Sequence, residues 1–275
     1  MNPYFWYLCL VPISSLTVSS LDSQTPDAKT ELSLGIAAYK RGADRETILH
    51  LEHAVSLDSR STVAHFYLAL AYEWMCRIDC ESHWSALAIQ EYNRVLDLDP
   101  SRKDALKSLA HFLYMLARFD EAEGLYRKAA TLDANDPEAL YAVAVFDWRR
   151  TYRVLVEGKF RLNLSPKQPA IGLPSCHEIR TKTIREVEEG IALLTRTLQL
   201  VSYVEPQTYM AVLYKERADL QCGDRAAYKR DMASEKQWWN RACVTWHTQK
   251  QSISPIRWFP GQPPPPPKRG DACRW

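Results

Sequence analysis

His50 and His53 lie three residues apart in a segment whose apolar pattern predicts a helix. Side chains at this spacing share one helical face, so the two imidazoles could be ligands of a metal ion. A metal site needs further ligands, and none is evident nearby in the sequence. We therefore interpret the pair as part of a solvated helix face and predict no metal site.

The cysteines offer a second kind of chemistry. Cys76-x3-Cys80 and Cys176-His177 are too sparse for zinc. If Cys9 leaves with an N-terminal leader, six cysteines remain, and they could form disulfides in fifteen pairings that the sequence does not distinguish. One of these could staple a loop. Reduced cysteines in a cytoplasmic protein are the alternative.

Catalytic patterns are missing from the sequence. It has no G-x-S-x-G, no glycine-rich phosphate loop and no cysteine in a recognisable protease context. The carboxylates are numerous but form no outstanding pair. We predict no catalytic residue and no cofactor. The weaker alternative is an enzyme whose site lies in residues 149–181, around Lys159, Arg161 and His177.

Composition narrows the functional classes further. Nine glycines in 275 residues argue against Rossmann turns and β-rich folds. The net charge is +2, and residues 248–275 contribute +4 (five basic residues minus one aspartate), so the remainder is near −2 (+2 − 4). We see no basic stripe and predict no nucleic-acid binding.

The two ends of the chain differ from its middle. Residues 1–20 carry no charge and hold an apolar stretch, Tyr4–Val11, that is too short to span a membrane. They resemble a secretory signal peptide, followed by a linker over 21–28. This favours an exported protein, periplasmic or secreted, with a cytoplasmic location as the alternative. Residues 248–275 include Pro263–Pro267 and predict a disordered, proline-rich tail.

Between the ends, apolar residues recur every three or four positions, which predicts helices. From breakers and caps we expect helices over approximately 30–40, 45–57, 61–76, 84–97, 102–117, 119–132, 137–155, 181–200, 205–220 and 224–247. Residues 156–180, with three prolines and two glycines, interrupt this rhythm.

The helical segments repeat with a period of thirty-four residues. Leu106-x2-Leu109-Ala110 is matched by Leu140-x2-Val143-Ala144, and 140 − 106 = 34. In the third unit, Ala122-x3-Tyr126 and Ala129 follow. The chain therefore resembles the tetratricopeptide-repeat (TPR) family. The split repeat, Asp147-Trp148-Arg149-Arg150 and Tyr214–Leu220 resemble a subgroup of exported bacterial members.

This resemblance implies an all-α fold, a TPR-type α-solenoid in which antiparallel helix pairs form a right-handed superhelix. About five repeats would occupy residues 29–223, with insertions at 76–83 and 149–181, and a C-terminal capping helix would follow at 224–247. Small residues such as Gly35 and Ala110 would lie where paired helices touch. Large ones such as Tyr92 and Tyr126 would fill the space between pairs.

The family also implies a function, because the first helix of each pair lines a concave groove that holds a peptide or helix of a partner protein. Carried over by register, the groove residues are Tyr39, Phe66, Glu73, Asp104, Lys107, His111, Tyr114, Tyr141 and Trp148. We expect a non-catalytic protein-binding scaffold with no membrane span. Two alternatives stay open: Tyr141 and Trp148 pack against the insertions or the tail, or the groove is occluded and the protein self-assembles.

Overall fold

The computed structural model describes residues 27–78, 82–161, 163–165, 169 and 175–248. Within these ranges the secondary structure is helical, without strands. The helices are α1 (Ala28–Arg41), α2 (Asp44–Leu57), α3 (Thr62–Ile78), α4 (Ser82–Leu98), α5 (Lys103–Met115), α6 (Phe119–Leu132), α7 (Pro137–Arg161), α8 (Cys176–Leu200), α9 (Val204–Asp219) and α10 (Arg225–Thr248).

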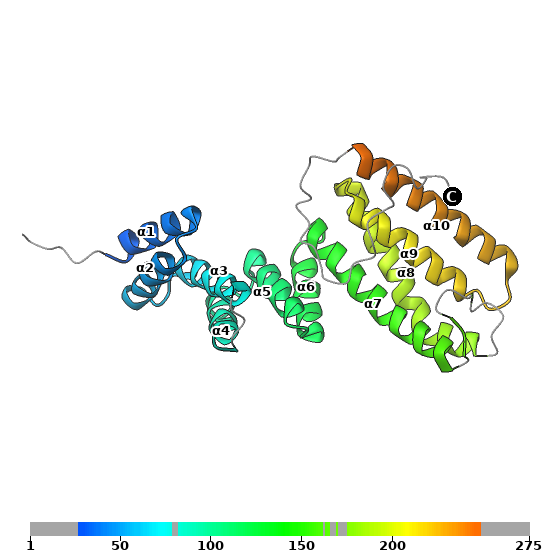
Figure 1. The fold of residues 1–275 in the computed structure, drawn as a ribbon, viewed down its shortest axis with the longest axis horizontal. Coiled ribbons are helices and arrows are strands. Elements are labelled where there is room, and N and C mark those ends of the chain that lie inside the picture. The colour runs from blue at the N-terminus through cyan, green and yellow to red at the C-terminus, as the bar shows by residue number, and fades with distance from the viewer. Residues whose placement is uncertain (1–26, 79–81, 162, 166–168, 170–174, 249–275) are drawn as a thin grey trace, which may run out of the picture.

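Consecutive helices pack as pairs: α1 with α2, α3 with α4, α5 with α6, α7 with α8, and α9 with α10. The first three pairs follow one another along the long axis of the molecule, and the pairs α7–α8 and α9–α10 lie side by side at its other end (Figure 1). Helices α1–α6 form a narrow arm, and α7–α10 form a thicker block in which α7, α8 and α10 have 25, 25 and 24 residues. The prediction of an all-α TPR-type solenoid is confirmed, and its last helix, α10, packs on α9.

A recurring Leu-Asp sequence ends the second helix of the first three pairs. Leu57, Leu98 and Leu132 are the last residues of α2, α4 and α6, and an aspartate follows each of them. The side chains of Asp58, Asp99 and Asp133 accept hydrogen bonds from the backbone N–H two residues further on, at 3.0 Å in each case. These local bonds stabilise a turn and so separate one helix pair from the next.

Inside the stack, small and large residues occupy the predicted places. A Cβ added to Gly35 would lie 2.6 Å from Cγ of Leu51, so α1 and α2 approach closely only because residue 35 is glycine. Ala110 is fully buried, as are the rings of Tyr92 and Tyr126. Because no pair could bury these surfaces alone, stacking of neighbouring pairs stabilises the fold.

The described part of the long insertion is largely helical. α7 continues to Arg161 and α8 begins at Cys176, so the expectation of helices ending near 155 and restarting near 181 was wrong. The first proline after α7 is Pro166, which leaves the helix free to continue. Each of these 25-residue helices is about 37 Å long, against about 21 Å for the 14-residue helices. A Cβ at Gly158 would lie 2.5 Å from Cδ1 of Ile179, so the two extensions pack tightly.

One disulfide joins Cys176, at the start of α8, to Cys222, just after α9. Cys243 in α10 is also disulfide-bonded, and Cys76 is a buried thiol. The described bridge therefore connects the long insertion to the turn between α9 and α10. The bond fixes the start of α8 relative to the end of α9.

Several expectations lie outside the described residues: the signal-like segment 1–20, most of the linker 21–28, Cys80 and the tail beyond Thr248. Among the helices that are described, none combines the length and the apolar character that crossing a bilayer requires.

Candidate partner-binding surface

The first helices of the pairs carry the residues that sequence register assigns to partner binding. We call the side of α1, α3, α5, α7 and α9 on which these residues lie the first-helix face. Accessible aromatic side chains lie on it or beside it on α1 and α3: Tyr39 is 38% exposed and Trp74 is 47% exposed. The indole N–H of Trp74 donates to Asp44 at the start of α2 at 3.1 Å. The ring centroids of Tyr39 and Tyr67 are 5.5 Å apart, and those of Tyr67 and Phe66 are 6.1 Å apart. These contacts hold an aromatic row across the two helices.

Charged groups border this row. The guanidinium of Arg102 lies 4.7 Å from the centre of the Phe66 ring, and its Nε donates to Asp104 at 2.9 Å. Asp104 itself is exposed. Glu73 is buried and accepts a hydrogen bond from the hydroxyl of Tyr92 at 2.7 Å. Asp104 can thus reach a partner, whereas Glu73 serves the packing of α3 on α4.

On α5 the first-helix face is less accessible. The ammonium of Lys107 lies 2.7 Å from Asp136 and 2.9 Å from Glu138, at the start of α7. Burial lowers the pKa of Lys107, but the hydrogen bonds to both carboxylates outweigh this effect and raise it. His111 is 8% exposed and Tyr114 is 5% exposed. Little of either side chain is available to a partner without rearrangement.

On α7 the residues at the same register positions pack against α9. Tyr141 is fully buried, and its ring centroid lies 5.7 Å from that of Tyr209. Trp148 is partly exposed, and its ring centroid lies 5.2 Å from that of Tyr209. Tyr141 therefore packs against α9, which belongs neither to the insertions nor to the tail, and it has no place on an open surface.

A cleft of about 740 Å³ lies where α7 passes the turn between α5 and α6. Its walls are the first turns of α6, including Phe119, and the part of α7 from Phe146 to Glu157. The guanidinium of Arg149 stacks over the Phe119 ring at 3.2 Å from its centre. Of its α7 lining, only Val156 and Glu157 lie beyond the helix expected from the sequence, 137–155.

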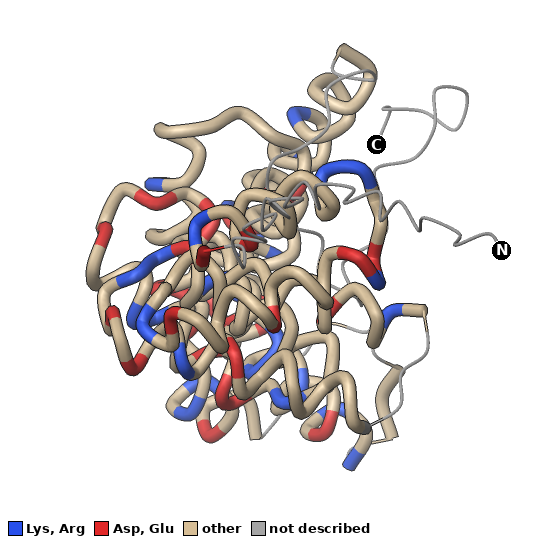
Figure 2. The backbone as a smooth tube through the Cα atoms, turned by 90° about the vertical axis from the view of Figure 1, so that its left-hand side faces the viewer, with Lys and Arg blue, Asp and Glu red and all other residues tan. Residues whose placement is uncertain are grey.

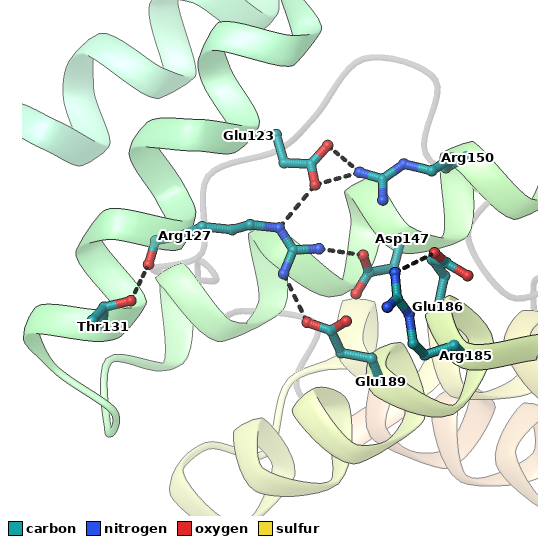
Figure 3. Close-up of polar contacts among 8 residues, drawn as sticks. All are labelled: Glu123, Arg127, Thr131, Asp147, Arg150, Arg185, Glu186 and Glu189. Atoms are coloured by element: carbon teal, nitrogen blue, oxygen red, sulfur yellow. Dashed lines mark hydrogen bonds and ion pairs between the residues drawn. The ribbon is translucent and has the colours of Figure 1, made fainter. Parts of the chain in front are cut away.

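Beside this cleft, a network of charged groups joins α6, α7 and α8 (Figure 3). Arg127 on α6 donates to Glu123 at 2.9 Å, to Asp147 at 2.6 Å and to Glu189 at 2.7 Å. Arg150 donates to both oxygens of Glu123. Burial raises the pKa of Asp147 to about 7, and the charge of Arg127 opposes this shift. The network fixes the third pair against the fourth.

A second buried polar group lies between α7 and α9. Lys159 forms an ion pair of 2.6 Å with Asp219, and Thr151 donates to Glu216 at 2.6 Å. Burial raises the pKa of Glu216 to about 8. This cluster is the nearest approach to the enzyme alternative, which grouped Lys159, Arg161 and His177. The latter two are exposed while Lys159 is buried, so the three residues do not share a site.

The two histidines of α2 contact α1. Nδ1 of His50 lies 2.7 Å from Glu31, and Nδ1 of His53 lies 3.2 Å from the other oxygen of that carboxylate. Both imidazoles therefore contribute to the packing of α2 on α1. No cluster of three or more histidine, cysteine, aspartate or glutamate side chains suited to a metal ion occurs in the described part of the chain.

Sequence register missed Trp74 and the exposed Met115, each one position beyond a chosen residue. It also missed Tyr67, which links Tyr39 to Phe66. The signal was present in the sequence, because each of these aromatic or thioether side chains directly follows a residue that register assigned to the groove.

No protein-family model and no curated protein matches this chain. Solved structures match its fold. A crystal structure of MamA aligns with a TM-score of 0.53 at 11% identity, over 84% of this chain and 98% of that one. MamA 41-end from Desulfovibrio magneticus RS-1 gives 0.53 at 12% identity, over 81% and 96%. YrrB, described as a TPR protein with an unusual peptide-binding site, gives 0.51 at 13% identity, over 82% and 89%.

Proposed function

From a chain with the tetratricopeptide-repeat fold, we propose a non-catalytic scaffold that binds a peptide or helix of another protein on the first-helix face of α1, α3 and α5. The observation that carries this proposal is the aromatic row of Tyr39, Tyr67 and Phe66, with Trp74 exposed nearby. Exposed aromatic side chains gathered on one surface are typical of sites where proteins bind one another.

The arrangement of the row supports this proposal. Ring contacts hold Tyr39 and Phe66 against Tyr67, so these side chains lose little conformational freedom when a partner binds. Asp104, exposed near the row, adds a charge that can discriminate between partners. YrrB, similar in fold, is described as having a peptide-binding site. That likeness shows the fold alone, so the assignment of these residues depends on their exposure and register.

To test it, we would capture partners from the native host with wild-type protein and with a Tyr39→Ser, Trp74→Ser variant. We expect the variant to lose the partner, with affinity reduced by about tenfold or more, because exposed aromatic residues dominate such interfaces. The matched control is Leu49→Ser with Leu132→Ser, which removes exposed apolar side chains from α2 and α6. Equal capture by both variants, with unchanged helical circular dichroism, would contradict the proposal.

A second candidate function is self-assembly with an occluded first-helix face, which the full burial of Tyr141 favours. It predicts a mass by light scattering that rises with protein concentration, and no captured partner. A constant monomeric mass together with a partner that the Tyr39→Ser, Trp74→Ser variant loses would exclude it.

We also propose export from the cytoplasm. The disulfide between Cys176 and Cys222 supports it, since such bonds persist mainly in oxidising compartments. The mature protein would then begin near residue 21, which amino-terminal sequencing of the protein from its native host can establish. An intact first residue on protein recovered from the cytoplasm would contradict export.

A further inference from the structure

The outer side of α10 carries five basic residues: Arg225, Lys229, Arg230, Lys236 and Arg241. All five are exposed, and none forms an ion pair with a described carboxylate. At about 100° per residue they fall within an arc of about 160° around the helix axis. The helix has a net charge of +3 (five basic residues minus two acidic ones, with histidine neutral). The net charge of the whole chain, +2, gives no indication of this basic surface.

The two carboxylates of α10 lie on the opposite side and are already engaged. Asp231 is buried and accepts hydrogen bonds from Arg217 at 2.6 Å and from Gln221 at 2.5 Å. Glu235 is partly buried, and burial raises its pKa. Neither group forms an ion pair with any of the five basic residues. At the α1–α2 end of the molecule, by contrast, acidic and basic residues are interspersed (Figure 2).

A cleft of about 770 Å³ lies between this side of α10 and the segment joining α8 to α9. Its lining combines apolar groups, such as Leu198 and Val244, with the amides of Gln237 and Asn240 and with two of the basic residues, Lys236 and Arg241. No carboxylate lines it. The guanidinium of Arg241 lies 4.8 Å from the centre of the Trp238 ring, which holds it at the edge of the cleft.

We propose that this cleft and the outer side of α10 form a second docking site, distinct from the first-helix face, for an extended acidic peptide segment of a partner protein. Carboxylates of the segment pair with Lys236 and Arg241, and its apolar side chains enter the cleft beside Trp238. The amides of Gln237 and Asn240 offer hydrogen bonds to its backbone. Charge complementarity selects an acidic sequence and speeds the encounter.

An anionic membrane fits this surface less well. A helix that lies in a bilayer interface presents a broad apolar face next to its basic one. On α10, Val244 is the exposed large hydrophobic residue, and the cleft beside it is concave and lined with amides. A narrow segment of chain fills such a concavity, whereas a flat lipid surface leaves it empty.

Fluorescence anisotropy with the full chain tests the proposal. The probe is a short fluorescein-labelled peptide of glutamates with interspersed leucines, and the control peptide has glutamine in place of glutamate. We expect wild-type protein to bind the glutamate peptide about tenfold more tightly than the glutamine peptide, with the difference shrinking as salt rises. The Lys236→Glu, Arg241→Glu variant should lose about tenfold or more in affinity for the glutamate peptide.

The matched control is Arg45→Glu with Lys128→Glu, which changes the net charge equally at exposed positions on α2 and α6. We expect it to bind the glutamate peptide within about twofold of wild type, because distant exposed charges are screened. Equal losses in both variants, or no preference for glutamate over glutamine, would overturn the proposal. It would also fail if vesicles of phosphatidylglycerol, and not the peptide, bound in a Lys236- and Arg241-dependent way. Neither double variant alters the first-helix face, so partner capture by that face can be scored separately.

Discussion

The ammonium of Lys159 and the carboxylate of Asp219 lie 2.6 Å apart, and both are buried between α7 and α9. Lys159 lies in the part of α7 that the insertion adds, and Asp219 is the last residue of α9. The ion pair therefore ties the extension of the fourth helix pair to the fifth pair.

Breaking this pair from one side should destabilise the protein strongly. Lys159→Met leaves the Asp219 carboxylate buried without its counter-charge, and we expect a loss of about 3–5 kcal/mol in the free energy of unfolding. The double variant Lys159→Met, Asp219→Leu removes both charges and should be within about 1–2 kcal/mol of wild type. Urea denaturation followed by circular dichroism measures both. Similar losses in the single and double variants would contradict this account.

Glu216 should make the stability of the protein depend on pH. Burial raises its pKa to about 8, while in the unfolded chain it returns to about 4.3. Between these values the folded state keeps a proton that the unfolded state has released, so stability falls as pH rises from about 4 to about 8. Glu216→Gln removes this dependence, and it should therefore stabilise the protein relative to wild type at pH above 8. Thermal unfolding across that range, compared with Glu186→Gln on α8, provides the measurement.

Removing the described disulfide should lower stability through the unfolded state. Cys176 and Cys222 are separated by 46 residues, and closing a loop of that size stabilises the folded chain by about 4 kcal/mol in the chain-entropy model. We expect Cys176→Ala with Cys222→Ala to lose about 2–4 kcal/mol in guanidinium unfolding. The variant should keep its helical circular dichroism, because the α8–α9 and α9–α10 contacts remain. An unchanged midpoint would show that the bond contributes little.

Two glycines should respond oppositely to alanine. Gly35→Ala places a methyl group 2.6 Å from Leu51, so α1 and α2 must separate, at a cost of about 1–3 kcal/mol. Gly124, within α6, has nothing within 4 Å of an added Cβ, and alanine there should stabilise the protein by about 0.5–1 kcal/mol. Differential scanning calorimetry of the two variants decides whether close helix approach explains the glycine of the first repeat. A gain in stability at both positions would refute that explanation.

Much of the fold was predictable, because the repeat encodes it locally. The close contact at Gly35 and the buried rings of Tyr92 and Tyr126 follow from one register applied in turn to each unit. The helical character of the insertion was not predictable from the same register. It depends on the contact of Gly158 with Ile179 and on the Lys159–Asp219 pair, both between residues that the thirty-four-residue period does not align.

The candidate surface was predictable in position and less so in accessibility. Register placed Tyr39 and Phe66 on the first-helix face, but exposure depends on what packs beside each residue. Tyr141 is buried next to Tyr209, although its register position is that of the half-buried Phe66. The basic side of α10 was not predicted, because basic and acidic residues are interspersed along its sequence. Only when they are placed around a helix do the basic residues fall on one side, opposite Asp231 and Glu235.

The unequal lengths of the helix pairs have a consequence for unfolding. α7–α10 include two helices of 25 residues, the Cys176–Cys222 bond and the buried Lys159–Asp219 pair. In the 28–132 arm the helices have at most 17 residues, and ion pairs such as His65–Glu91 join neighbouring helices. In such linear arrays each unit opens according to its own stability and that of its neighbours. Amide hydrogens should therefore exchange fastest in α1 and α2 and slowest in the block from α7 onward. A ligand bound to α1 and α3 would slow amide exchange in the arm. Part of its binding free energy would be used to suppress local unfolding of these two helices, which lowers its affinity.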